Sequence, residues 1–96
     1  MLKPETLLSF AKYVWWKTPQ EALASPERLI AQVMNIGTYD DVQRLTAGTE
    51  KDMLRGILRN AQAGYFNPKS WAYWHYRLGL VKSGEQIPGR PKRILG

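Results

Sequence analysis

Helix start signals recur at short intervals along this chain, and they restrict it to a succession of short helices. A capping side chain directly before a proline is the arrangement favoured at the first turn of a helix, and it occurs at Thr18-Pro19, Ser25-Pro26 and Asn67-Pro68. An acidic residue three positions after a capping hydroxyl, favourable at the positive end of the helix dipole, follows Thr18, Thr38 and Thr49. Each signal predicts that a new helix begins there.

Between these starts the apolar residues recur at helical spacing, as in Leu7, Phe10 and Val14. No run of alternating β-branched residues competes with that pattern. The spacing predicts helices near residues 4–16, 19–24, 26–36, 39–47, 50–62 and 68–78. Only a few residues connect them, so successive helices must pack as neighbours. The predicted fold is all-α, a compact bundle of five to six short helices.

Ninety-six residues are enough for one domain and one modest core. We place the bundle at residues 1–81. The segment 82–96 has little to bury and is rich in turn residues, with Gly84, Pro88, Gly89 and Pro91. It is predicted to be a flexible basic tail.

The chain contains no cysteine, which excludes disulfides, thiolate metal ligands and a cysteine nucleophile. Its apolar runs are broken by charged residues well before the roughly 20 apolar residues that a membrane span requires. The first residues also lack the charged, apolar and small-residue order of a signal peptide. The composition therefore predicts a cytoplasmic protein with no membrane partner.

The net charge is +6, from 14 Lys and Arg against 8 Asp and Glu. Half of this excess lies in the last fifteen residues, which contain Lys82, Arg90, Lys92 and Arg93 against Glu85. A concentrated basic tail favours an anionic partner, either nucleic acid or an acidic protein surface, although many ordinary soluble proteins carry such tails.

The last predicted helix, 68–78, contains too many aromatic side chains for all of them to be buried in so small a domain. At 100° per residue Trp71, Trp74 and Leu78 share one face, which we assign to the core. Tyr73 and Tyr76 lie away from that face. Amphipathic aromatic residues are enriched at binding hot spots, so Tyr73 and Tyr76, with the neighbouring Arg77, are the predicted partner-binding residues. The alternative is a rim of ordinary half-buried tyrosines.

Lys51, Arg55 and Arg59 recur every four residues and form a positive stripe on the helix predicted at 50–62. Together with Arg90, Lys92 and Arg93 they are the predicted nucleic-acid-binding residues of an alternative function, through contacts to phosphates. A solvated helix face is the simpler interpretation. A helix-turn-helix reader is poorly supported, because acidic residues lie at the start of both candidate reading helices: Asp40 and Asp41, or Glu50 and Asp52.

Catalysis has little support in the sequence. His75 is the only histidine. It has no second metal ligand at a suitable spacing, so a structural role is predicted for it. Ser70 resembles no nucleophile motif, and the glycines are isolated helix stops without the spacing of a phosphate loop. The sequence predicts a protein that is not an enzyme and has no cofactor and no metal.

Several segments resemble a group of small bacterial helical proteins whose genes often adjoin nucleotidyltransferase-type toxins of the AbiEii class. The resemblance covers about two thirds of the chain and rests on Trp15-Trp16, residues 26–34, residues 37–42, residues 66–71 and Tyr73-Trp74. It implies an antitoxin-like or accessory protein that binds and restrains a partner enzyme. It transfers no functional residue, and the basic tail lies outside it.

The first functional hypothesis is therefore a protein-interaction module that presents Tyr73, Tyr76 and Arg77 to a nucleotidyltransferase-like toxin. The second is a sequence-independent nucleic-acid-binding protein that uses the basic stripe and the tail. A third is a subunit that only self-associates through its aromatic face.

Overall fold

The computed structural model describes residues 2–82 and 84–91, and within these ranges the regular structure is entirely helical. The all-α prediction is confirmed. The elements are α1 (Pro4–Ser9), the 3₁₀ helix η1 (Phe10–Val14), α2 (Pro19–Ala24), α3 (Pro26–Ile36), α4 (Tyr39–Gly48), α5 (Lys51–Arg59) and α6 (Pro68–Arg77).

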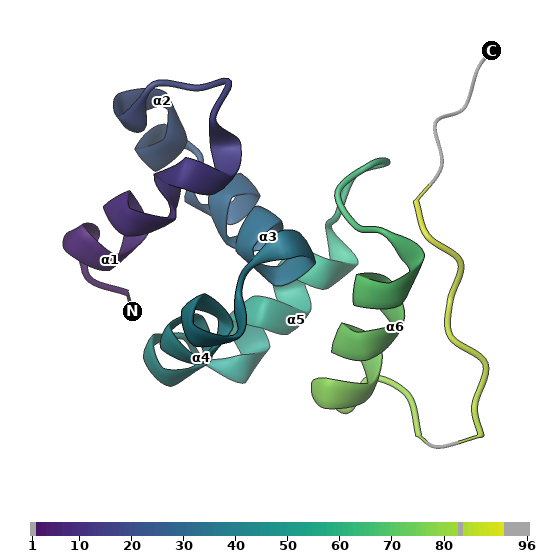
Figure 1. Cartoon of the computed structure of the whole chain (residues 1–96). Coiled ribbons are helices and arrows are strands. Elements are labelled where there is room, and N and C mark those ends of the chain that lie inside the picture. Colours follow the sequence, from purple (N-terminus) through teal and green to yellow (C-terminus); the bar gives the residue numbers. More distant parts are fainter. Residues whose placement is uncertain (1, 83, 92–96) are drawn as a thin grey trace, which may run out of the picture.

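Helix α3 is the centre of the bundle. It contacts η1, α2, α4, α5 and α6, which surround it in Figure 1. Residues 29–34 of α3 are buried without interruption, Gln32 among them. A helix that is covered on all sides organises the core of a small domain. The shorter helices are therefore positioned by what each of them buries against α3.

Three of the predicted helix caps are present. Thr18 and Glu21 form the predicted capping box, with Glu21 N donating to Thr18 Oγ1 (3.2 Å) and Thr18 N donating to Glu21 Oε1 (2.9 Å). Thr38 and Asn67 accept hydrogen bonds from the third residues of α4 and α6. These helices begin where the sequence predicted.

Two of the predicted capping side chains make no capping hydrogen bond, although α3 begins at Pro26 after Ser25 as predicted. Ser25 precedes α3 but also ends α2, and its backbone (φ −127°, ψ 69°) lies outside the extended region in which a side chain caps. Thr49 is one residue too early, because α5 takes Glu50 as its N-cap. The Thr49 hydroxyl is instead buried and has no hydrogen-bond partner among the described residues.

Two predicted helices are shorter in the structure. The first, predicted at 4–16, tightens into η1 after Ser9, whose hydroxyl donates to Thr6 O (2.6 Å) and offers the backbone a competing hydrogen bond. The helix predicted at 50–62 ends at Arg59, because the backbone of Asn60 (φ −96°, ψ 9°) leaves the helical region; the Asn60 side chain donates to Gly56 O (2.8 Å). Helix α6 ends at Arg77, shortly before Gly79, which has a positive φ of 69°.

The core confirms the assignment of the aromatic helix. Trp71, Trp74 and Leu78 are all buried, and Trp74 Nε1 donates to Met34 O on α3 (2.7 Å). Buried Trp rings normally find a partner for the indole N–H in this way. Trp74 thus ties α6 to α3 by packing and by a hydrogen bond.

Residues 84–91 run back alongside α6 (Figure 1). Trp71 Nε1 donates to Pro88 O (2.7 Å), Arg90 Nη1 donates to Phe66 O (3.1 Å), and Ile87 packs against the core. None of residues 84–91 is buried and most are exposed, as predicted for a segment with little to bury, but the sequence did not predict these contacts with the bundle. Lys92 and Arg93 lie outside the described residues, and the domain boundary at residue 81 stays a prediction.

Candidate partner-binding groove

A groove of about 430 Å³ lies between the end of α3, the start of α4 and the length of α6. Its lining combines buried core side chains with exposed ones. The lining residues include Ile36, Tyr39, Val42, Tyr73, Trp74 and Arg77. The groove exists because α4 and α6 both pack on α3 but make little contact with each other.

Tyr73 and Arg77 lie one helical turn apart on α6 and form one unit in this groove. Arg77 Nη1 donates to Tyr73 Oη (2.7 Å), and its Nη2 donates to Thr46 Oγ1 on α4 (3.3 Å). The guanidinium also lies over the Trp74 ring, 5.1 Å from the centroid. Arg77 is therefore held in place by both walls of the groove, while Tyr73 is half exposed above it.

Tyr76 does not line the groove, although it is as exposed as Tyr73. Of the three predicted partner-binding residues, the structure brings together Tyr73 and Arg77 and separates Tyr76 from them. The reason is helical geometry, because the adjacent residues Tyr76 and Arg77 project about 100° apart around the helix.

The sequence interpretation missed Tyr39 and Ile36, which line the same groove from the opposite wall. Tyr39 is 77% exposed and Ile36 is 45% exposed. A signal was available for Tyr39, because it directly follows the capping residue Thr38. A large apolar residue at the first position of a helix has no earlier turn of that helix to cover it.

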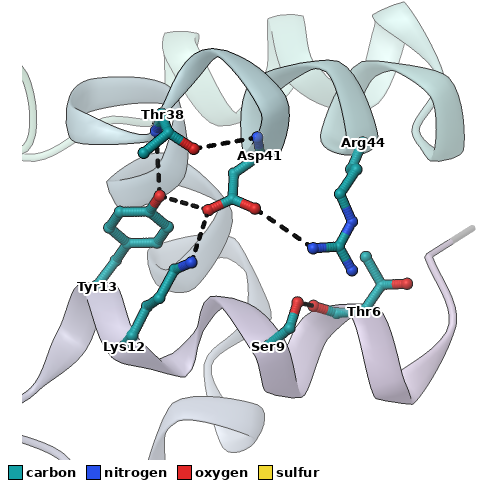
Figure 2. A network of polar contacts seen from close by, with 7 residues as sticks. All are labelled: Thr6, Ser9, Lys12, Tyr13, Thr38, Asp41 and Arg44. Carbon is teal, nitrogen blue, oxygen red and sulfur yellow. Dashed lines mark hydrogen bonds and ion pairs between the residues drawn. The ribbon is translucent and has the colours of Figure 1, made fainter.

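The opposite side of α4 is closed by the polar network in Figure 2. Asp41 is 4% exposed and accepts hydrogen bonds or ion pairs from Tyr13 Oη (2.5 Å), Lys12 Nζ (2.9 Å) and Arg44 Nη1 (3.3 Å). Tyr13 Oη in turn accepts from Thr38 N (3.0 Å). The hydrogen bond from Tyr13, followed by that from Lys12, holds the pKa of Asp41 below its usual value. This network anchors the start of α4, and with it one wall of the groove, to η1.

The basic stripe of the alternative function is only partly available to a ligand. Arg55 Nε donates to Leu78 O (2.8 Å) and Arg55 Nη1 pairs with Asp52 (2.9 Å), so this side chain fastens α5 to the end of α6. Lys51 and Arg59 are exposed near the two ends of α5. In the tail, Arg90 is bound to Phe66 O. The structure does not place Lys92 and Arg93.

His75 and Ser70 are occupied by contacts within the protein. His75 is buried, with Nδ1 2.7 Å from Trp71 O, an arrangement that fits the structural role predicted for it. Ser70 Oγ donates to Asn35 O (2.7 Å). In residues 2–82 and 84–91, no three His, Asp or Glu side chains are grouped so that they could hold a metal ion.

Over the same ranges, none of the helices has the length and apolar character needed to cross a membrane.

Comparison of the chain with protein-family models, with curated proteins and with solved structures found no match. The resemblance to proteins encoded beside AbiEii-class toxins thus stays a prediction.

Proposed function

We propose that this chain is a non-enzymatic protein-interaction module whose partner binds in the groove between α3, α4 and α6. The observation that carries this proposal is the pair of exposed tyrosines, Tyr39 and Tyr73, on opposite walls of one groove beside a fixed arginine, Arg77. Tyrosine and arginine are among the residues that contribute most to binding at protein interfaces.

The packing of the groove favours binding in a second way. Arg77 is already oriented by Tyr73, Thr46 and Trp74, so little side-chain entropy is lost when a partner contacts it. Trp15 and Trp16 are exposed as well, but they contact each other edge to face at 4.8 Å and line neither wall of the groove. We therefore place the partner on the tyrosine groove.

The finer form of the proposal is an antitoxin-like or accessory protein that acts in the cytoplasm and restrains a nucleotidyltransferase-type enzyme. Its support is the resemblance of the helical segments together with a groove that can receive a segment of another protein. The nucleic-acid alternative has weaker support, because Arg55 and Arg90 are engaged with backbone carbonyls.

Site-specific photo-crosslinking in the source organism tests the proposal. A photoreactive residue at position 39 should capture a defined partner protein, and the capture should be lost with Tyr73→Ala. The matched control is the same photoreactive residue at Gln20, which is exposed on α2 and does not line the groove. The captured enzyme is then assayed with and without the purified chain, and we expect its activity to fall when the chain is added.

Two results would count against the proposal. Equal capture of the same protein at positions 39 and 20 would show that the groove is not the contact. Tight duplex binding that weakens steeply with salt, without any loss in Tyr73→Ala, would favour the nucleic-acid alternative.

A further inference from the structure

We infer that the groove receives an acidic segment of the partner protein, which places an apolar side chain over the groove and an Asp or Glu carboxylate between Arg77 and Lys51. This inference rests on the proposed function and specifies the chemistry of the partner. It is carried by the shape and the charge of the surface on both sides of Arg77.

Arg77 borders a second cavity in addition to the groove. This basic pocket, of about 300 Å³, is lined by Thr46, Thr49, Lys51, Leu54, Arg77 and Leu78. It lies where the end of α4, the start of α5 and the end of α6 meet. Arg77 lines both spaces and, through its hydrogen bond to Thr46 on α4, stands between them, so an extended segment lying in the groove would cross over Arg77 to reach the basic pocket.

The charges along this path have one sign. Lys69 and Arg77 line the groove, and Lys51 and Arg77 line the basic pocket, whereas no Asp or Glu is among the lining residues of either. The nearest buried acid, Asp41, is directed to Tyr13, Lys12 and Arg44 on the other side of α4. A carboxylate in the path would therefore meet cations on the lining of both spaces, with no Asp or Glu among the lining residues.

The start of α5 carries both signs of charge, because the exposed Glu50 and Asp52 flank Lys51, and Asp52 is paired with Arg55. Glu50 is the N-cap residue, and its side chain makes no capping hydrogen bond, so the first amides of the helix receive no acceptor from it. The positive end of the helix dipole lies beside Lys51. A carboxylate bound by Lys51 and Arg77 would form charge-assisted hydrogen bonds, which are stronger than neutral ones.

The groove half of the path is suited to an apolar side chain. Its lining includes Met34, Ile36, Val42 and the edge of Trp74, and two tyrosine rings stand at its sides. A nucleic acid would fit this surface less well, because it presents phosphates at regular intervals and needs cations spaced along the strand. The described cation that would extend the row along α5, Arg55, is instead bonded to Leu78 O and Asp52.

The test is a selection of peptides from a random dodecapeptide library displayed on phage, using the full chain as bait. We expect the enriched peptides to share an Asp or Glu next to an apolar residue. Synthetic versions of the best peptide, with the acid and with the acid replaced by its amide, are then titrated by fluorescence anisotropy. The acidic peptide should bind about tenfold more tightly, the scale of one charge-assisted hydrogen bond.

Variants identify the site of the carboxylate. Arg77→Gln and Lys51→Gln should each weaken binding of the acidic peptide about tenfold and remove most of its advantage over the amide peptide. The matched control is Arg59→Gln, which removes the same charge from α5 but lines neither cavity, and it should bind like the wild type. Lys51 is exposed, so its variant keeps the test valid even if Arg77→Gln unfolds.

The outcomes separate this inference from the proposed function. In one outcome the enriched peptides require Tyr73 but carry no Asp or Glu, and they bind equally well to Lys51→Gln. This result would overturn the inference that the segment is acidic and would leave the groove as the proposed binding site. The absence of any peptide whose binding depends on Tyr73 would overturn both. A thymidine oligonucleotide that competes for the site more strongly than the acidic peptide would overturn both as well and favour nucleic acid.

Discussion

The two sides of helix α4 differ in how their polar groups are used. Toward η1, the carboxylate of Asp41 is buried and surrounded by three donors from Tyr13, Lys12 and Arg44. Toward α6, Tyr39 is almost fully exposed, and the cations lining the groove face no carboxylate among its lining residues. Asp41 and Tyr39 are two residues apart, so one turn of helix serves both sides.

The residues on the η1 side of α4 therefore stabilise the bundle, whereas the residues on the groove side are available to bind a partner. A buried charge surrounded by donors contributes to stability only while all of its partners remain, and removing one of them is destabilising. Exposed aromatic side chains on a groove contribute little to the folding of the isolated chain. Substitutions on the η1 side should therefore change the free energy of unfolding, and those on the groove side should change binding.

The largest effect is expected for Trp74, a groove residue that also belongs to the core. Trp74→Ala should lower the free energy of unfolding by about 3–5 kcal/mol, because the bundle cannot refill the cavity. The matched control is Tyr39→Ala, which lines the same groove but should change stability by no more than about 0.5 kcal/mol. Urea denaturation of both variants tests this pair. If Trp74→Ala were as stable as the wild type, Trp74 would not stabilise the core, and the proposed difference between stabilising and partner-binding residues in the groove would be wrong.

The second effect concerns Asp41. Asp41→Asn should lower the free energy of unfolding by about 1–3 kcal/mol, since Tyr13 and Lys12 lose their charged acceptor. The neighbouring Asp40→Asn is the control, because Asp40 is exposed and its replacement should stay within about 0.5 kcal/mol. Equal effects at both positions in the same denaturation experiment would show that the network does not anchor α4.

A pH dependence should accompany this network. The pKa of Asp41 is lowered in the folded protein, first by the Tyr13 hydroxyl and then by Lys12, so the unfolded chain binds more protons in acid. The stabilisation from Asp41 should be complete above the usual Asp pKa of about 3.9 and disappear as the pH falls through the lower folded value.

Thermal unfolding between neutral pH and strong acid checks this expectation. The loss of stability in acid should be shallower in Asp41→Asn than in the wild type. Glu21→Gln is the comparison variant, because the capping-box bonds to Thr18 also lower the pKa of Glu21. An acid profile that Asp41→Asn leaves unchanged would contradict the role given to this carboxylate.

The smallest effect is expected at Thr49, and it has the opposite sign. Thr49→Val replaces a buried hydroxyl that has no partner in the described chain by a methyl group of similar shape, and should raise the free energy of unfolding by about 1 kcal/mol. Thr46→Val is the control and should not stabilise, because the Thr46 hydroxyl is bonded to Gln43 O and Arg77. Calorimetry of the two variants decides the sign, and a loss of stability in Thr49→Val would show that its hydroxyl has a partner.

Local sequence signals predicted much of the fold. The starts of α2, α4 and α6 followed from Thr18, Thr38 and Asn67, because a capping side chain bonds to an amide only three residues away. The burial of Trp71 and Trp74 followed from helical periodicity. The Thr49 cap was predicted wrongly, because Glu50 has equally suitable backbone geometry and burial of the Thr49 side chain decided between them.

The site was predicted less completely. Tyr73 and Arg77 were recognised because they lie on a helix whose other face is the core. Tyr39 and Ile36 were not, since they come from a wall more than thirty residues away in the sequence. The contact of residues 84–91 with Trp71 was also missed, because no local pattern tells which distant carbonyl an indole N–H will meet.

What the sequence by itself determined is the helical class, the positions of most helix starts and the face of α6 that enters the core. These features depend on interactions between residues within one or two helical turns of each other, and such neighbours can be identified from their spacing in the sequence. Only the tertiary structure decided that Tyr39 faces Tyr73, that Arg77 links the groove to Lys51, and that Asp41 is enclosed while Asp40 is not. Such pairings depend on the angles at which α4 and α6 pack on α3, and those angles are set by the whole core at once.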